Sequence, residues 1–430
     1  MQGREQSDRQ WVIDVVNGNV KLNREEEAEE WTHRCIYKIP SYLHDFHEGS
    51  FAPRLVSLGP LHHGSPHLQP MEHHKRRALL HFLDRSKHSP DVYLKALEAV
   101  ERKLRACYEW PDELPVMESP DFLNMMLLDG CFLLELHRTT SDEDTSGYTD
   151  DDPVFGPNRA DFFADNKTHD LVLLENQIPL LVLQTLLDPL GERSQAVEAH
   201  KVAYELYWSD KYTSMQDKRG MHLLHVYQMT TPWGDIPEVE EGLKNPEPYH
   251  KKVPSATALH DAGVRFQVSP SDGSMDFSFD GGVLKLPYVV ITPSEETFLL
   301  NVMAFEQLHV DMDNPISSVV KLMDNLIDTA KDVQLLVDSG IIENRMESDQ
   351  EVAELFNRVT KGMAFFENSN LKGVRTRLIR HCKRRQNLWR ARFVNTYLRD
   401  PWTVIALLAA GLLLCLTLLQ TVYSVLSYIK

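Results

Sequence analysis

The chain has 430 residues, of which 42% are hydrophobic, and a formal net charge of −18 at pH 7. Such an acidic chain is repelled by nucleic acid, so we predict no nucleic-acid partner. The five cysteines are scattered and include no Cys-x-x-Cys pair. This usage is typical of a reducing compartment and excludes a disulfide framework or a cysteine-based zinc site.

The composition along the chain predicts a mainly α fold with a small β component (α+β) and no internal repeat. We expect four parts: a polar acidic tail (1–30), a single large, mainly helical domain (31–370), a basic segment (371–400) and an apolar C-terminal segment (401–430). The last two parts carry +10 together, which leaves −28 on the rest of the chain. The acidic body and the basic segment should therefore have different partners.

Three prolines, at positions 40, 53 and 60, forbid a long helix near the start of the domain, so we expect an extended chain there. Histidines gather in and after this stretch. Their spacing is loose and contains no HExxH motif, which favours hydrogen-bonded structural histidines over a metal site. We predict no metal and no cofactor. The cluster comprises His44, His47, His62, His63, His67, His73, His74 and His81, with Asp45 and Glu72 nearby.

Ser119-Pro120 is a helix start signal, and the residues from Phe122 to Leu136 are apolar nearly all round. The sequence therefore predicts a buried helix that contains one acid, Asp129. Residues 141–152 after it are acidic and are predicted to form an exposed loop. An EF-hand reading of this loop fails, because Pro153 stands where calcium needs a glutamate.

Three polar residues, Glu175, Asn176 and Gln177, interrupt the apolar run from Leu171 to Leu183. Polar groups in a core cost several kcal/mol unless they are hydrogen-bonded. The triplet could be an active site, or it could satisfy a backbone break and cap a helix that starts at Pro179. We favour the structural reading and predict no catalytic residue; Asp129 is a second buried polar candidate for the same network.

Three stretches that alternate apolar and polar residues predict a small antiparallel β meander near 264–291, with Asp280-Gly-Gly as a turn. Asn314-Pro315 predicts the start of a helix that ends near Gly340. A capping box at Ser348 predicts the start of another helix.

The C-terminal run from Trp402 to Ile429 is uncharged and long enough for a transmembrane helix, so we expect a single-pass membrane anchor over 401–430. The ten basic residues of 371–400 should contact anionic lipid headgroups. Because basic residues flank the cytosolic side of a span, we expect the body in the cytosol, at the plasma membrane or the endoplasmic reticulum.

Six motifs in order resemble those of the plant family named domain of unknown function 247. They are Ile36–Pro40, Ser57–His63, Met71–Arg77, Leu127–Glu135, Leu174–Pro179 and Pro254–Gly263. The resemblance implies a plant membrane protein without an established enzymatic activity. Some grass members are associated with self-incompatibility as pollen-side determinants, which implies recognition of a partner protein.

Standard hydrolase, nucleotide and dinucleotide signatures do not occur in the chain. Our leading hypothesis is therefore a membrane-anchored recognition or signalling protein that acts through an unidentified protein partner. The alternative is an enzyme with an unrecognised polar site around Asp129 and Glu175.

Overall fold

The structure is a computed structural model. The predicted tail at 1–30, the first part of the acidic loop and half of the basic segment lie outside the residues that it describes. The described residues are 31–110, 117–140, 145–158, 168–190, 195–208, 220–231, 251–269, 277–310, 312, 314–365, 371–384, 389 and 401–429.

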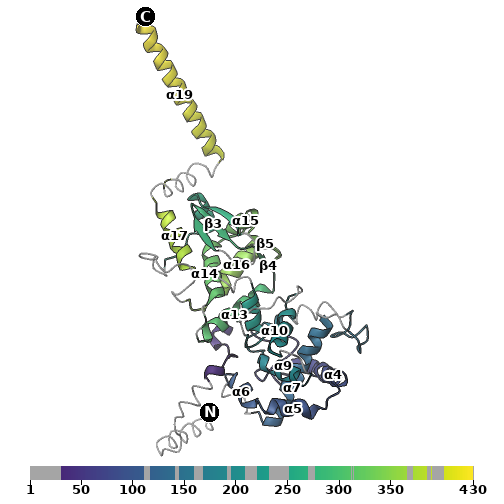
Figure 1. Ribbon diagram of the computed structural model, residues 1–430. Helices are drawn as coiled ribbons and strands as arrows, with labels where there is room; N and C mark the ends of the chain where they lie inside the picture. The colour runs from purple at the N-terminus through teal and green to yellow at the C-terminus, as the bar shows by residue number, and fades with distance from the viewer. Residues whose placement is uncertain are drawn as a thin grey trace, which may run out of the picture. The chain divides into compact units, whose positions relative to one another are not determined.

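Contacts divide the chain into two compact units, Met1–Met229 and Thr230–Lys430, whereas the sequence predicts a single domain over 31–370. We call them the N-terminal and the C-terminal unit. Both are mainly helical in their described parts, and the prediction of a mainly α fold is confirmed (Figure 1).

The N-terminal unit is built from helices joined by irregular segments. Its elements are α3 (Ser41–Phe46), η1 (Pro66–Leu68), α4 (Gln69–Ser86), α5 (Pro90–Glu98), α6 (Glu101–Ala106), α7 (Ser119–Thr140), α9 (Leu180–Leu187), η2 (Asp188–Leu190), α10 (Gln195–Glu205) and α11 (Leu223–Thr230). The prediction of a proline-rich stretch without a long helix is confirmed, since α3 is the one α-helix described between residues 35 and 60.

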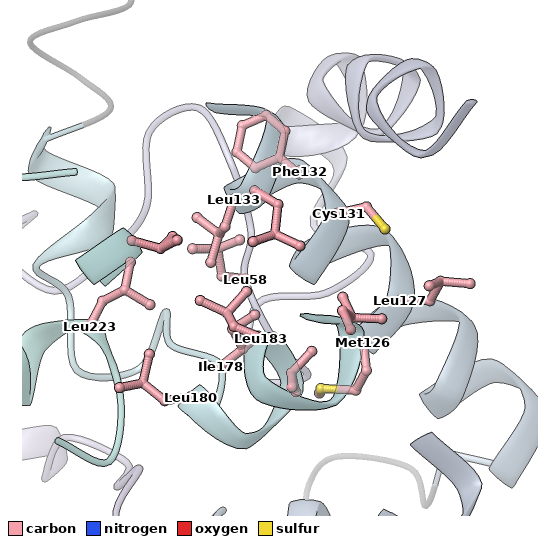
Figure 2. Packing of buried hydrophobic residues seen from close by; sticks show 14 of the residues in the cluster. Leu58, Met126, Leu127, Cys131, Phe132, Leu133, Ile178, Leu180, Leu183 and Leu223 are labelled. Carbon is pink, nitrogen blue, oxygen red and sulfur yellow. The ribbon is translucent and has the colours of Figure 1, made fainter. Parts of the chain in front are cut away.

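Helix α7 is the centre of this unit and begins at Ser119, as its start signal predicts. It packs against α4, α5 and α9. Contact with α9 is close, because a Cβ atom at Gly130 would lie 2.5 Å from Leu186 Cδ1. Figure 2 shows the apolar side chains of this core, including Phe132 of α7, Leu183 of α9, and Leu58 and Ile178 from irregular segments.

The acidic loop is packed at its end. Asp152 is 3% exposed, and its Oδ1 accepts hydrogen bonds of 3.0 Å from the amides of Val154 and Phe155. Its other oxygen pairs with Arg77 of α4. Burial alone would raise the pKa of Asp152, but these donors outweigh it and lower the pKa. The loop therefore uses its last acid to attach to α4, whereas exposed acids precede it.

The C-terminal unit combines helices with two small sheets. Its elements are α12 (Ala256–Asp261), β1 (Arg265–Val268), β2 (Ser278–Asp280), β3 (Val283–Leu286), β4 (Val289–Ile291), α13 (Glu295–Leu308), α14 (Pro315–Leu326), α15 (Ala330–Asp338), β5 (Ile342–Asn344), α16 (Asp349–Val359), α17 (Lys372–Lys383) and α19 (Pro401–Ile429).

The predicted antiparallel meander is wrong. Strands form where the alternation predicts them, but their order is β1-β3-β2, and β1 pairs with β3 in parallel, with Arg265 opposite Val283. Strand β4 joins β5 in a separate parallel pair. Only β2 and β3 form an antiparallel hairpin. Alternation reports which side of a strand is buried and carries no information about which neighbour a strand selects.

The predicted helix from Pro315 to near Gly340 is two helices, α14 and α15. The break lies at Asp328-Thr329, where Thr329 and Asp332 form a capping box that starts α15. Asp332 is 1% exposed and also accepts bonds from the amide and the hydroxyl of Thr257, at 2.9 and 2.8 Å. The apolar stripe continues across the break, so periodicity alone does not reveal it. The predicted start of α16 after Ser348 is confirmed.

Helix α19 covers the residues for which we predicted a membrane span. None of the helices in the described part of the chain is both long and apolar enough to cross a bilayer, so the predicted transmembrane helix over 401–430 is wrong. A span needs about 20 consecutive apolar residues.

Candidate functional site

The four polar residues singled out from the sequence lie in a buried polar cluster of the N-terminal unit. Its members come from α4, from α7 and from the turn before α9. We use the name polar cluster for these seven residues: Glu72, Lys75, Asp129, Asp170, Glu175, Asn176 and Gln177. All seven are buried.

Asp170 holds the start of an irregular segment, residues 54–59. Its Oδ1 accepts a bond of 2.8 Å from the amide of Arg54, and its Oδ2 accepts bonds of 2.7 and 2.9 Å from the amides of Leu55 and Val56. The ring Nδ1 of His169 lies 3.0 Å from Oδ1. One carboxylate therefore satisfies three consecutive amides of a segment that has no strand partner there.

Asn176 continues this role further along the same segment. Its Oδ1 accepts a bond of 2.7 Å from the amide of Leu58, and its Nδ2 donates to the carbonyl oxygens of Val56 and Asp170, both at 3.0 Å. The side chain is 0% exposed. Asn176 thus pairs with the backbone of segment 54–59 much as a neighbouring strand would.

Gln177 connects the turn that contains it to helix α11. Its Nε2 donates to the carbonyl oxygens of Leu171 and Leu173, at 2.6 and 2.9 Å. Its Oε1 accepts a bond of 3.0 Å from the amide of Leu224, in the first turn of α11. The sequence left open that the triplet caps the helix after Pro179, but α9 has no side-chain cap. Gln177 instead caps α11, which is distant in sequence.

Glu175 connects the polar cluster to two other segments of the unit. Its Oε1 accepts a bond of 2.6 Å from the amide of Ile39, and its Oε2 lies 3.2 Å from His62 Nε2. The side chain of His62 is 20% exposed, against 8% for that of Glu175. Glu175 therefore joins two surface segments that are separated in sequence.

Lys75 places a charge in the centre of the cluster and is 0% exposed. Its Nζ lies 2.6 Å from Glu72 Oε1 and 2.6 Å from Asp129 Oδ1, and it donates to the carbonyl oxygen of Ser57 at 2.6 Å. The other oxygen of Asp129 accepts a bond of 2.8 Å from the amide of Gly59. Burial alone would lower the pKa of Lys75, but the two carboxylates outweigh it and raise the pKa, which keeps the ammonium charged.

Lys75 and Asp170 are not among the site residues predicted from the sequence. Lys75 stands on the same face of α4 as Met71, Ala78 and Phe82, all buried. A lysine on an apolar helical stripe is the signal that could have revealed a buried charge. Asp170 directly precedes the apolar run that contains the triplet, which is a weaker signal.

Two histidines of the cluster seen in the sequence make local contacts. His67 Nε2 lies 3.0 Å from the carbonyl oxygen of Pro53, and His74 Nδ1 lies 3.0 Å from Arg77 Nη1. Within the described ranges, no group of three or more histidine, cysteine, aspartate or glutamate side chains could hold a metal ion.

The geometry of the polar cluster predicts a measurable loss of stability for Asn176→Ala. Three buried backbone groups would lose their partner, so we expect the free energy of unfolding to fall by about 1–3 kcal/mol. Asn124 is exposed on α7, and Asn124→Ala is the matched control, expected within about 0.5 kcal/mol of wild type. Urea unfolding of the full chain, combined with hydrogen exchange of residues 54–59, measures both effects. Equal stability of the two variants would contradict a structural role of Asn176.

Comparisons with known proteins agree with the resemblance seen in the motifs. The pattern of DUF247, described as a plant protein of unknown function, matches residues 36–416. The chain is 30% identical to the UPF0481 protein At3g47200 of Arabidopsis thaliana, over 92% of this chain and 87% of that protein. It is 24% identical to the putative UPF0481 protein At3g02645 of the same plant, over 95% and 93% of the two chains. No solved structure matches significantly.

Proposed function

Because the chain belongs to DUF247, a family of plant proteins of unknown function, we propose its function from its own residues: it is a recognition protein that acts by binding another protein. The observation that carries this proposal is that the polar cluster bonds mainly to the protein's own main chain. Its carboxylates and amides bond to the main chain of segment 54–59 and its neighbours. These groups hold the main chain that leads to the partly exposed residues 61–67, and they do not face a substrate.

Burial of the central residues supports the proposal over the enzymatic alternative. A catalytic acid or base must come within hydrogen-bond reach of its substrate. Asp129 is 1% exposed and Asn176 is 0% exposed. A cavity of 570 Å³ in this unit is lined instead by α6 and by residues such as Arg34 and Trp110. Asp129 and Glu175 are not part of its wall.

The surface that the polar cluster positions is well suited to binding a protein. Glu175 holds Ile39 and His62 beside each other. Helix α3 follows Ile39 and exposes two aromatic side chains, Tyr42 (50% exposed) and Phe46 (52% exposed). Residues 61–67, which follow segment 54–59, form an irregular loop that contains His62 and runs into η1. We call α3 together with residues 61–67 the recognition face.

Rigidly held loops and exposed aromatic side chains are the features that protein-binding surfaces share. Binding residues concentrate on loops that a scaffold fixes in place. Aromatic residues are enriched among those that contribute most to affinity. Asp45 and Glu48 are exposed next to the aromatic residues. The recognition face is therefore suited to a partner that presents apolar and basic side chains.

Partner recognition is also what the resemblance to the grass self-incompatibility determinants implies. A more specific version of the proposal is that the protein takes part in a self-incompatibility-like recognition. This version specifies the kind of partner and leaves the chemistry of the recognition face unchanged.

The test compares the wild-type chain with the double variant Tyr42→Ala/Phe46→Ala. Proximity labelling in the native tissue identifies candidate partners, and calorimetry with the purified partner measures affinity. We expect the double variant to weaken binding by at least about 10-fold, because each truncated aromatic residue removes buried apolar contact. Leu80→Ala is the matched control, since Leu80 is 66% exposed on α4, outside the recognition face.

Two results would overturn the proposal. One is a partner whose affinity is equally reduced by Leu80→Ala, or unaffected by the double variant. The other is a reaction catalysed by the purified chain and abolished by Glu175→Gln without a change in stability. That result would favour the enzyme with a polar site around Asp129 and Glu175.

A further inference from the structure

A basic cavity lies in the C-terminal unit, where helix α17 meets the turn between β2 and β3. Its volume is 430 Å³. We call it the arginine cavity. Its lining residues are Phe279, Asp280, Gly281, Gly282, Arg377, Arg380, His381 and Arg384.

The turn side of this cavity is main chain. Asp280 and Val283 are paired across the hairpin, so Gly281 and Gly282 form a two-residue turn, with φ of 55° and 81°. Positive φ at both central residues is the geometry of a type I′ turn and favours glycine. A Cβ at Gly281 would meet nothing within 4 Å, whereas a Cβ at Gly282 would lie 3.5 Å from His381 Cε1, so a ligand can approach the backbone closely at Gly281.

The helix side supplies the charge. Arg377 and Arg380 are three residues apart in α17, which places them on one face of the helix, and Arg384 is the C-cap residue that directly follows it. Helix α17 packs against β2, and the rings of Phe279 and His381 make an edge-to-face contact with centroids 5.3 Å apart. The three guanidinium groups are therefore held over the glycine turn.

Arginine is the most frequent charged residue in the wall of this cavity, which contains three arginines and one acid, Asp280. Basic residues near the C-terminus of a helix interact favourably with its dipole, and this accounts for part of the pattern at Arg380 and Arg384. It does not account for Arg377, which lies in the middle of α17, or for a cavity bounded by two glycines.

We propose that the arginine cavity binds the phosphate groups of a small polyol that carries two or more phosphates, either free or as a lipid headgroup. Guanidinium groups bind phosphate oxygens in a bidentate manner, and several of them together select a multiply charged anion. A volume of 430 Å³ is within the range of small-molecule sites and exceeds what one inorganic phosphate would fill.

His381 should respond to such a ligand. Burial and the charge of Arg384 lower its pKa, against a hydrogen bond with the backbone of Ala262 that raises it. The imidazole is thus mainly neutral at neutral pH. The charged groups around His381 in this cavity are Arg377, Arg380, Arg384 and Asp280. A bound phosphate adds negative charge beside His381 and therefore favours the protonated form of its imidazole. Affinity should therefore increase as the pH falls from about 7 to about 6.

The experiment measures binding of inositol 1,4,5-trisphosphate to the full chain by calorimetry. A second arm measures cosedimentation with phosphatidylcholine vesicles that contain phosphatidylinositol 4,5-bisphosphate. We expect Arg380→Ala/Arg384→Ala to weaken binding roughly 10- to 100-fold, because each arginine contributes a charge-assisted bond. Both side chains are exposed, so the fold should persist. Arg380→Lys should be intermediate, since it keeps the charge and loses the bidentate geometry.

The control is Lys331→Ala/Lys361→Ala, which removes the same charge from exposed positions elsewhere in this unit. Loss of binding in the arginine variant alone supports the proposal. Binding to both probes then indicates recognition of the phosphates themselves, and binding to vesicles alone indicates a lipid-borne headgroup. Equal loss in the lysine control, or no binding of either probe, would overturn it.

Discussion

Replacing Lys75 by methionine should lower the free energy of unfolding by about 3–5 kcal/mol, the largest effect that we expect from a single substitution in the polar cluster. Methionine matches the length of the side chain but removes the ammonium group. Asp129, which is 1% exposed, would then keep a buried negative charge without its cation. In the wild type, the attraction between Lys75 and Asp129 is largely offset by the cost of removing both charges from water, so the net contribution of the pair is moderate. A buried charge without a partner has no such attraction and is costly.

The pH dependence of this loss tests its cause. Without Lys75, which lowers the pKa of Asp129 against the effect of burial, that pKa rises further in the folded state. A carboxyl whose folded pKa is raised contributes stability below its unfolded pKa, and this contribution is lost as the pH rises through the folded pKa. The deficit of Lys75→Met should therefore be smaller near pH 4 than near pH 8, in urea unfolding of the full chain.

Two further variants make the prediction specific. Arg76 is the exposed neighbour of Lys75 on α4, and Arg76→Met should change the stability by no more than about 0.5 kcal/mol. Lys75→Met/Asp129→Asn should recover part of the loss, because the buried charge is removed while an oxygen remains to accept the Gly59 amide. If Lys75→Met is no more destabilising than Arg76→Met, the ion pair has no structural role.

Gly59→Ala should cost about 2–5 kcal/mol, the sum of backbone strain and a steric clash. Gly59 has a φ of +72°, and a Cβ there would lie 2.5 Å from Gln177 O and 2.9 Å from Tyr108 Oη. Tyr108 Oη donates to that same Gln177 oxygen at 3.1 Å, so neither group can move without breaking a buried bond. The substitution should therefore displace the end of segment 54–59 from Asp129.

A second glycine separates the two contributions. Gly64 has a φ of +82°, but a Cβ there would meet nothing within 4 Å. Gly64→Ala should cost only the strain of the left-handed conformation, about 1–2 kcal/mol. The difference between the two variants, measured by urea unfolding, is the cost of the clash. Equal values would show that the space around Gly59 adapts.

Local signals in the sequence determined where several elements begin and end. Helix α7 starts at Ser119, α14 at Pro315 and α16 after Ser348, each at a capping or proline signal. The Asp280-Gly-Gly turn forms the β2–β3 hairpin as predicted. These features depend on hydrogen bonds and backbone angles within a few residues, and a sequence carries that information directly.

The tertiary structure alone decided which distant groups meet. The sequence indicated that Asn176 and Asp129 must be satisfied in a core, but not that their partners are the amides of Leu58 and Gly59. It likewise gave no sign that β1 pairs with β3 in parallel. Such contacts join residues far apart in the chain, and they are selected by the packing of the whole unit, because a buried polar group accepts any partner of suitable geometry. The sequence therefore determined that a buried polar network must exist, and the fold decided that this network holds segment 54–59.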